Sequence, residues 1–166
     1  MMLGRSFFLK KILSGLFLVF LVAGCSKEAL QEISNQSSKE YSPPTVQFKI
    51  DEAVYSTKQG SFCWRNDNSA ECLSLPSPTE IVEETKPIKV KGKETITLLM
   101  ERQPSEHTLT IENSDFYAQE LAINEEKQFK APEIDGVYIL KYYAIWEKDT
   151  SGTSGDSSYV FKIEVK

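Results

Sequence analysis

Histidine is almost absent from this chain, because His107 is the only one among 166 residues. A Ser-His-Asp or Cys-His catalytic group would depend on that one side chain. His107 lies between the segment 103–106 and Thr108, and we expect it to be an exposed loop residue at the edge of a strand. A zinc site needs several His or Cys ligands at characteristic spacings, and none of these occurs. The sequence therefore predicts no metal site, no cofactor and no catalytic residue, as in a protein that is not an enzyme.

No apolar run near the N-terminus is long enough for a comfortable membrane span. The run Ile12–Ala23 follows Arg5, Lys10 and Lys11 and ends in small residues, which is typical of a secretory signal. Val22-Ala23-Gly24-Cys25 resembles the bacterial lipobox, with valine where leucine is more common. That resemblance implies cleavage before Cys25 and attachment of diacylglycerol to it. The alternatives are an ordinary secretory signal cut elsewhere and an uncleaved anchor.

Cysteine is scarce too, since the chain has three: Cys25, Cys63 and Cys72. The sequence contains no Cys-x-x-Cys motif, so a redox centre is not indicated. If Cys25 is acylated, Cys63 and Cys72 remain as a pair in a compartment that permits disulfides. We expect them to be bonded to each other, closing a local loop, and two free thiols are the alternative.

Basic residues are outnumbered: 19 Lys and Arg face 24 Asp and Glu, for a net charge of −5. Removing residues 1–24 takes away three positive charges and no negative ones, which brings the net charge to −8. Nucleic acid is a poor partner for such a chain. Anionic lipid headgroups are equally unfavourable, so the predicted membrane attachment is the lipid anchor alone.

Large apolar residues are few between Ser26 and Pro44, where Ser, Gln and Glu dominate and a Pro-Pro pair closes the segment. Such a composition cannot bury enough apolar surface to become ordered. We therefore predict a signal peptide at residues 1–24, a lipidated N-terminus and flexible tether at 25–44, and one folded domain at 45–166.

From residue 45 onward, apolar residues recur with a period of two, as in half-buried strands. The last strand is the clearest, with Phe161 and Ile163 inward and Lys162 outward. The run Val137–Trp146 is apolar on both faces, which predicts a central strand covered on each side and paired with the last strand through a loop at 147–157. An irregular segment or a single helical turn around Asp115–Ala122 would be compatible with this pattern of strands. Further strands are predicted at 45–50, 88–91, 95–100 and 108–111.

Several short strands without an amphipathic helix predict a sandwich of two antiparallel sheets. Pro132-Glu133-Ile134-Asp135-Gly136-Val137-Tyr138 resembles the corner near the C-terminus of immunoglobulin-like domains, in which a Tyr hydroxyl bonds back to the backbone. Tyr138 is the matching residue. The resemblance implies an immunoglobulin-like β-sandwich.

A second resemblance covers most of residues 60–166. It rests on Gly60-Ser61-Phe62-Cys63-Trp64, Cys72, Lys86-Pro87-Ile88-Lys89-Val90, Tyr143-Ala144-Ile145-Trp146 and the final strand. These segments together are similar to small predicted lipoproteins of Bacillus-type Gram-positive bacteria. The resemblance implies a compartment and a fold, and it brings no catalytic residue.

Candidate binding residues lie in the loop that the two cysteines would close: Trp64, Arg65 and Asp67. Trp64 is expected mainly to pack, for instance on the disulfide, with binding as the alternative. The loop 149–156 carries Asp149 and Asp156, but it lacks the spacing of a calcium loop, so a mobile hairpin tip is favoured.

Aromatic residues of the central strand are the other candidates. Tyr142, Tyr143 and Trp146 form either an aromatic platform or, for at least two of them, part of the core. Adjacent glutamates, such as Glu83 and Glu84, indicate solvated surface.

We therefore expect a lipoprotein on the extracytoplasmic face of the cell membrane. Its β-sandwich would act as a non-enzymatic binding or accessory module for a protein or cell-envelope partner. The alternatives are a protease inhibitor that presents the loop Arg102–His107 and an envelope hydrolase.

Overall fold

The structure is a computed structural model that describes residues 42–113 and 116–166. The signal peptide predicted at 1–24, the lipidation site Cys25 and the tether up to residue 41 lie outside the described residues. The ordered part includes the Pro-Pro pair, because Pro43 is buried and the Pro44 carbonyl accepts a hydrogen bond from the Tyr159 hydroxyl. In residues 42–113 and 116–166, no helix has the length and apolar character needed to cross a membrane.

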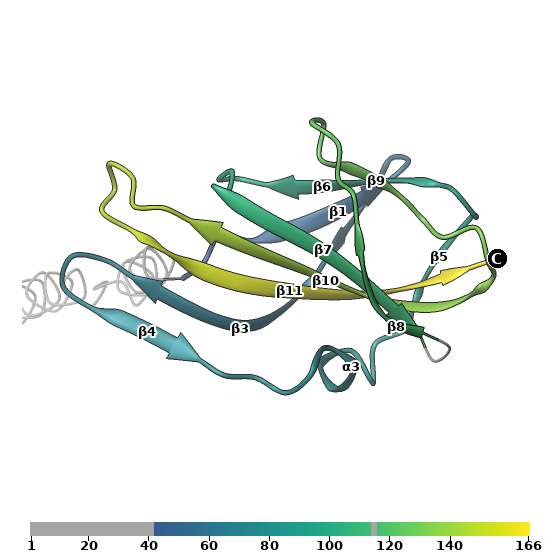
Figure 1. Ribbon diagram of the computed structural model, residues 1–166, viewed down its shortest axis with the longest axis horizontal. Coiled ribbons are helices and arrows are strands. Elements are labelled where there is room, and N and C mark those ends of the chain that lie inside the picture. The colour runs from purple at the N-terminus through teal and green to yellow at the C-terminus, as the bar shows by residue number, and fades with distance from the viewer. Residues whose placement is uncertain (1–41, 114–115) are drawn as a thin grey trace, which may run out of the picture. The chain divides into compact units, whose positions relative to one another are not determined.

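Two β-sheets packed face to face make up the domain, which confirms the predicted all-β sandwich (Figure 1). The small sheet has the order β2-β1-β6-β9, and the large sheet has the order β4-β3-β11-β10-β7-β8, with β5 alongside the end of β11. The small sheet consists of β1 (Val46–Ile50), β2 (Ala53–Ser56), β6 (Thr95–Met100) and β9 (Gln128–Lys130). The large sheet consists of β3 (Lys58–Arg65), β4 (Ala70–Leu73), β5 (Ile88–Val90), β7 (Glu106–Asn113), β8 (Phe116–Leu121), β10 (Gly136–Trp146) and β11 (Ser154–Val165).

The arrangement of the large sheet follows the immunoglobulin pattern in its centre. Strands β7, β10 and β11 are antiparallel neighbours, as strands C, F and G are in that fold. The tyrosine corner predicted at Tyr138 is confirmed, because its hydroxyl donates a hydrogen bond of 2.8 Å to the Ile134 carbonyl. The departure is the hairpin β3–β4, which continues the sheet beyond β11.

The core lies between the two sheets and is filled by alternate residues of their strands. Phe48 of β1 stacks on Phe161 of β11, with ring centroids 4.3 Å apart. Phe161 and Ile163 are 3% and 0% exposed, which confirms the inward register predicted for the last strand. The predicted hairpin of the last two long strands is confirmed as well, although β11 begins at Ser154, so the connecting loop is shorter than 147–157.

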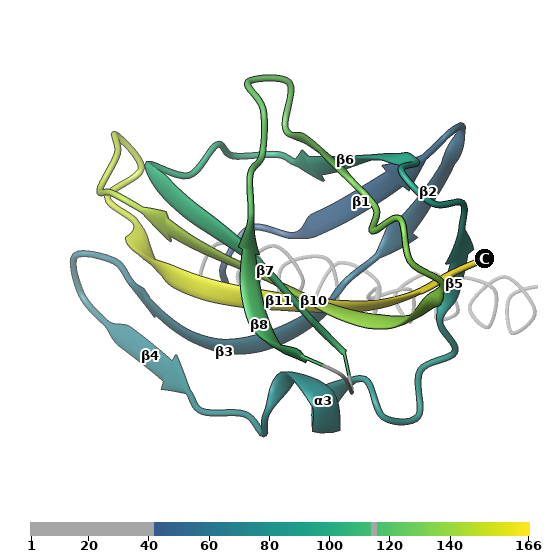
Figure 2. The ribbon, with the colours of Figure 1, turned by 45° about the vertical axis from the view of Figure 1, so that its right-hand side comes forward.

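One strand is covered on both faces, but it is β11 and not β10 as predicted. In β10 the buried residues alternate with partly exposed ones, whereas Ser157–Phe161 of β11 are all buried. The segment after β4 provides the outer cover. It forms a short helix, α3 (Pro78–Ile81), on the side of the large sheet away from the small sheet (Figure 2), and places Val82 there at 0% exposure.

The segment Asp115–Ala122, which the sequence allowed to be irregular or a single helical turn, is neither in the described residues, because 116–121 form the strand β8. β8 pairs with β7, with Leu121 opposite Leu109. This strand lacks a local alternation signal, and backbone pairing with β7 decides its conformation.

Candidate functional site

The hairpin β3–β4 carries the predicted binding residues and is held together by a disulfide. Cys63 and Cys72 are bonded to each other and lie directly opposite in the strand register. The predicted disulfide is therefore present, and it links neighbouring strands rather than the two sheets. All four residues of β4 are exposed. The hairpin is a fixed projection at one edge of the large sheet.

Trp64 anchors this hairpin to the core. Its side chain is 4% exposed and meets Trp146 of β10 edge to face, with ring centroids 5.7 Å apart. Gly155 of β11, the strand between β3 and β10, is paired with Trp64 on one side and with Trp146 on the other. A Cβ atom on Gly155 would lie 2.2 Å from the Cys63 carbonyl oxygen and 2.8 Å from the Trp64 ring. Only glycine leaves the two indoles room to meet across β11.

The packing role expected of Trp64 is therefore observed, but its partner is Trp146 and not the disulfide. Trp64 and Cys63 are neighbours in one strand, so their side chains point to opposite faces. Within residues 42–113 and 116–166, the Trp64 Nε1 atom is buried without a hydrogen-bond partner. The exposed members of the predicted loop are Arg65 and Asp67.

Arg102 joins the neighbouring loops beneath this hairpin. Its guanidinium donates to the Glu147 carbonyl at 2.8 Å and to the Thr153 hydroxyl at 2.9 Å, and it lies 3.0 Å from a carboxylate oxygen of Asp149. It also lies over the Trp64 ring, 5.6 Å from the centroid. The Arg102 carbonyl in turn accepts the Trp146 indole N–H at 3.1 Å. Arg102 is thus turned inward, and the segment 102–107 does not present it as an inhibitor loop would.

The loop between β3 and β4 is ordered by Asn66. Its side-chain oxygen accepts the backbone N–H groups of Asn68 and Ser69 at 2.9 and 2.8 Å, and its N–H donates to the Ser69 carbonyl at 2.9 Å. Asp67 extends from this loop to form an ion pair with Lys148 of the β10–β11 loop. The two hairpin tips lie at the same end of the domain (Figure 1). The ion pair between Asp67 and Lys148 fixes one point of the β10–β11 loop, whose tip is predicted to be mobile.

A hollow of about 400 Å³ opens beside this loop. It is lined by Trp64, Arg65, Asn66, Ser69, Ala70 and Glu71. Two of the three predicted binding residues, Trp64 and Arg65, are among them, whereas Asp67 is not. The lining combines a guanidinium, a carboxylate, an amide and a hydroxyl, which suits a polar side chain better than an apolar ligand.

His107 lies away from this hollow. It is the second residue of β7, is partly buried, and its ring lies 5.8 Å from that of Tyr142. Burial lowers the pKa of His107, and the nearby Lys127 lowers it further. The expectation of an exposed loop residue is wrong, because pairing with β10 includes residue 107 in the sheet.

The calcium alternative finds no support in the site geometry. Asp149 accepts hydrogen bonds from the N–H and hydroxyl of Ser151, which hold the pKa of its carboxyl below the usual value, as does Arg102. Asp156 lies in β11 and bonds to Tyr143, whose pKa is raised by burial and by that carboxylate. Within the described ranges, no group of three His, Cys, Asp or Glu residues is placed to hold a metal ion.

The aromatic residues of β10 divide between core and surface. Tyr142 and Trp146 are 0% and 1% exposed, so these two fill the core as expected. Burial raises the pKa of Tyr142 well above its usual range, and the neighbouring Tyr159 adds to the effect. Tyr143 points to the other face and is partly exposed.

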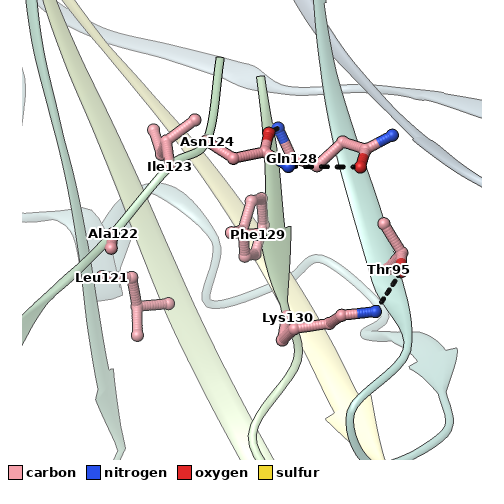
Figure 3. A pocket seen from close by; sticks show the side chains of 8 residues that line it. All are labelled: Thr95, Leu121, Ala122, Ile123, Asn124, Gln128, Phe129 and Lys130. Carbon is pink, nitrogen blue, oxygen red and sulfur yellow. Dashed lines mark hydrogen bonds between the residues drawn. The ribbon is translucent and has the colours of Figure 1, made fainter. Parts of the chain in front are cut away.

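A second hollow, also about 400 Å³, lies at the opposite edge of the sandwich (Figure 3). Here the Asn124 backbone N–H donates a hydrogen bond of 2.9 Å to the Gln128 carbonyl. The Gln128 backbone N–H in turn donates one of 2.7 Å to the side-chain oxygen of Asn124. Lys130 donates to the Thr95 hydroxyl. The polar groups at this edge are thus bonded to one another. The other residues that line the hollow are Leu121, Ala122, Ile123 and Phe129.

No protein family, curated protein or solved structure matches this chain. The sequence did not predict that Gly155 leaves room for two tryptophans to meet, or that the Arg102 side chain turns inward. The Gly-Ser-Thr composition of the 147–157 loop gave no signal that one glycine would lie between two tryptophans.

Proposed function

We propose that the protein is a lipoprotein, anchored through Cys25 on the extracytoplasmic face of the cell membrane, whose sandwich is a non-enzymatic binding module. Its recognition surface is the stapled hairpin, by which we mean residues 63–72, together with the loop 147–153. The anchor part of the proposal rests on the N-terminal sequence. The binding part rests on the geometry of the hairpin.

The observation that carries the proposal is the combination of exposure and rigidity in the stapled hairpin. All of β4 is exposed, yet the hairpin is fixed by a disulfide at its centre, by Asn66 in its loop and by Trp64 in the core. Ordering exposed residues in advance lowers the entropy cost of binding a partner. Solubility alone does not require an exposed hairpin to be held this rigidly.

The environment of His107 favours binding over hydrolysis. A general base needs an orienting carboxylate and a nucleophile or water in one cleft. The His107 ring lies 5.8 Å from that of Tyr142. Burial, and then the cation of Lys127, lower the pKa of His107, which makes the imidazole a weaker base.

The test is complementation of a strain that lacks the gene. A His107→Ala variant should restore the wild-type phenotype to the deletion strain, whereas an Arg65→Ala, Asp67→Ala double variant should not, although both proteins remain folded. A Lys93→Ala, Glu133→Ala variant, which removes an exposed ion pair of 2.7 Å elsewhere, is the matched control. If the folded His107→Ala variant behaves like the deletion and the Arg65, Asp67 variant does not, the binding-module proposal is wrong.

A further inference from the structure

The outward backbone groups of β4 have no strand beside them. The Cα atoms of Cys63 and Cys72 are 4.1 Å apart, which is the spacing of a non-hydrogen-bonded antiparallel pair. Because the two pair types alternate, Glu71 and Leu73 exchange hydrogen bonds with β3, and the N–H and C=O of Ala70 and Cys72 point away from it. β4 ends the large sheet, and among the described residues only β3 pairs with it. Such an edge is a template for another strand.

The extended conformation of this edge is maintained beyond β4. The hydroxyl of Ser61 on β3 accepts the Leu75 N–H at 2.9 Å, and Pro76 follows directly. Leu73 and Leu75 are 45% and 37% exposed, which places apolar side chains next to the free backbone groups. An incoming strand would thus meet a prepared ladder with apolar contacts beside it.

The edge strand β9, at the opposite edge of the sandwich, differs from β4 because its outward groups are protected. In β9, the outward N–H and C=O of Gln128 are both bonded to Asn124, and Lys130 adds a charge (Figure 3). Charged residues and local hydrogen bonds of this kind protect edges against strand pairing. β4 carries neither a lysine nor a local cap of this type.

The charge around β4 indicates which occupant fits. The stretch from Ala70 to Thr85 contains Glu71, Glu80, Glu83 and Glu84 and no Lys or Arg. All four glutamates are exposed. A cationic segment is attracted to this edge, whereas a second copy of the chain would place two acidic edges side by side.

We propose that β4 binds an extended, lysine- or arginine-containing segment of a partner protein by strand addition. The segment pairs with Ala70 and Cys72, its apolar side chains lie on Leu73 and Leu75, and one polar side chain enters the hollow beside Ala70 and Glu71. The inference rests on the proposed function and names its class of partner.

The first experiment measures binding of a fluorescent nine-residue peptide of alternating lysine and valine to the full chain in detergent, by fluorescence anisotropy. Ala70→Pro should weaken binding at least tenfold, because proline removes an outward N–H and its ring occupies the edge. The hydrogen bonds to β3 are kept. Ser56→Pro is the matched control, because the two-residue turn between Ile50 and Ala53 places Ser56 N–H outward on the edge strand β2. It should leave the affinity unchanged.

Two further peptides test the chemistry on the unaltered chain, so the result does not depend on the folding of a variant. Methylation of alternate backbone nitrogens, on the face that would pair, should abolish binding. Replacement of each lysine by glutamate should do the same. Absence of binding by the first peptide, equal binding by Ala70→Pro and Ser56→Pro, or equal binding of the lysine and glutamate peptides would each overturn the proposal.

Self-association provides the remaining outcome. Dimers that form with rising concentration and are lost in Ala70→Pro would show that the β4 edge binds a second copy of the chain. They would overturn the proposal that it binds a cationic segment of a partner. Complementation separates this inference from the proposed function. If Ala70→Pro restores the wild-type phenotype to the deletion strain while the Arg65, Asp67 double variant does not, strand addition is wrong and the binding module stands. If that double variant also restores it, the proposed function itself fails.

Discussion

Arg102 and Gly155 hold the loop end of the domain together through opposite properties. Arg102 provides several donors that reach the loop 147–153, and its guanidinium lies over the Trp64 ring, whereas Gly155 leaves space between Trp64 and Trp146. Both residues contribute to the packing around Trp64 and Trp146, and neither belongs to a motif that can be recognised in the sequence. At this scale, the partners of a side chain decide its role.

Replacement of Arg102 by alanine should lower the free energy of unfolding by about 2 to 3 kcal/mol, because charge-assisted hydrogen bonds to Glu147 and Thr153 are lost together. Arg102→Lys should recover only a small part, since an ammonium cannot reproduce the planar fork. Urea unfolding measures both. Lys93→Ala, in an exposed ion pair with Glu133, should cost less than about 1 kcal/mol. Equal effects of Arg102→Ala and Lys93→Ala would contradict the role assigned to Arg102.

His107 should make stability depend on pH in the mildly acidic range. Its pKa is lowered from the ordinary value of 6.5 in the folded protein, first by burial and then by Lys127. The unfolded chain therefore binds the proton more readily, and the free energy of unfolding should fall as the pH drops below about 6.5. Urea midpoints between pH 7.5 and 5.5 should decrease in the unaltered protein, and less in His107→Gln. The lowered carboxyl pKa values of Glu80 and Asp149 act below this window.

The roles of strands β3 and β11 in the fold depend on the strands beside them. β11 pairs with β10 along nearly its whole length and with β3 and β5 along parts of it. The small sheet and the segment after β4 cover its two faces, so Ser157–Phe161 are all buried. β3 is bound to the sandwich on one side and to the exposed β4 on the other. The first element supplies the core, and the second supplies the projecting edge.

Reduction of the Cys63–Cys72 bond should destabilise the domain by about 2 to 3 kcal/mol in the chain-entropy model, since the bond closes a loop with a sequence separation of 9. We expect β4 to loosen before the core, because among the described residues it pairs with β3 alone and all four of its residues are exposed. Hydrogen exchange with and without reductant measures this. Thiol counting on protein from its native envelope is the companion measurement, and two alkylatable thiols before reduction would rule the bond out there.

Truncation of Phe161 to alanine should cost about 3 to 5 kcal/mol, enough to unfold a marginally stable domain. Phe161 is 3% exposed and stacks on Phe48 of the other sheet. Lys162→Ala removes only a hydrogen bond of 3.0 Å to the Glu83 carbonyl at the outer face, and should cost about 1 kcal/mol or less. Thermal unfolding of both variants checks the register, which would be wrong if they were equally tolerated.

In the proposed function, the whole molecule combines a membrane anchor predicted from its N-terminal sequence with a binding edge in its folded domain. The net charge of −5 leaves contact with anionic lipid unfavourable, so attachment to the membrane depends on the predicted lipid. The stapled hairpin and the 147–153 loop together form one end of the sandwich. An anchored domain with a rigid, acidic edge is suited to holding a partner near the membrane.

Cys25→Ser should prevent lipid attachment and leave an uncleaved or secreted protein, because the thioether requires the thiol of Cys25. Partition between detergent and water phases, with the size of the mature chain, measures this. Cys72→Ser is the control: it removes the disulfide and should leave partition unchanged. A Cys25→Ser protein that is processed and partitions like the unaltered one would show that the anchor lies elsewhere.

The sequence alone determined the β10–β11 hairpin and the inward register of Phe161 and Ile163, which depend on local alternation. The cysteine count predicted the Cys63–Cys72 bond, and a resemblance to immunoglobulin-like domains implied the corner at Tyr138. Side chains alternate along a strand whatever its partners are, so a period of two reveals the buried face. Only the tertiary structure decided that β8 is a strand, that Arg102 turns inward, and that β4 ends the sheet with free backbone groups. These features depend on which distant segments meet, because pairing partners and free edges are set by contacts between strands far apart in the chain.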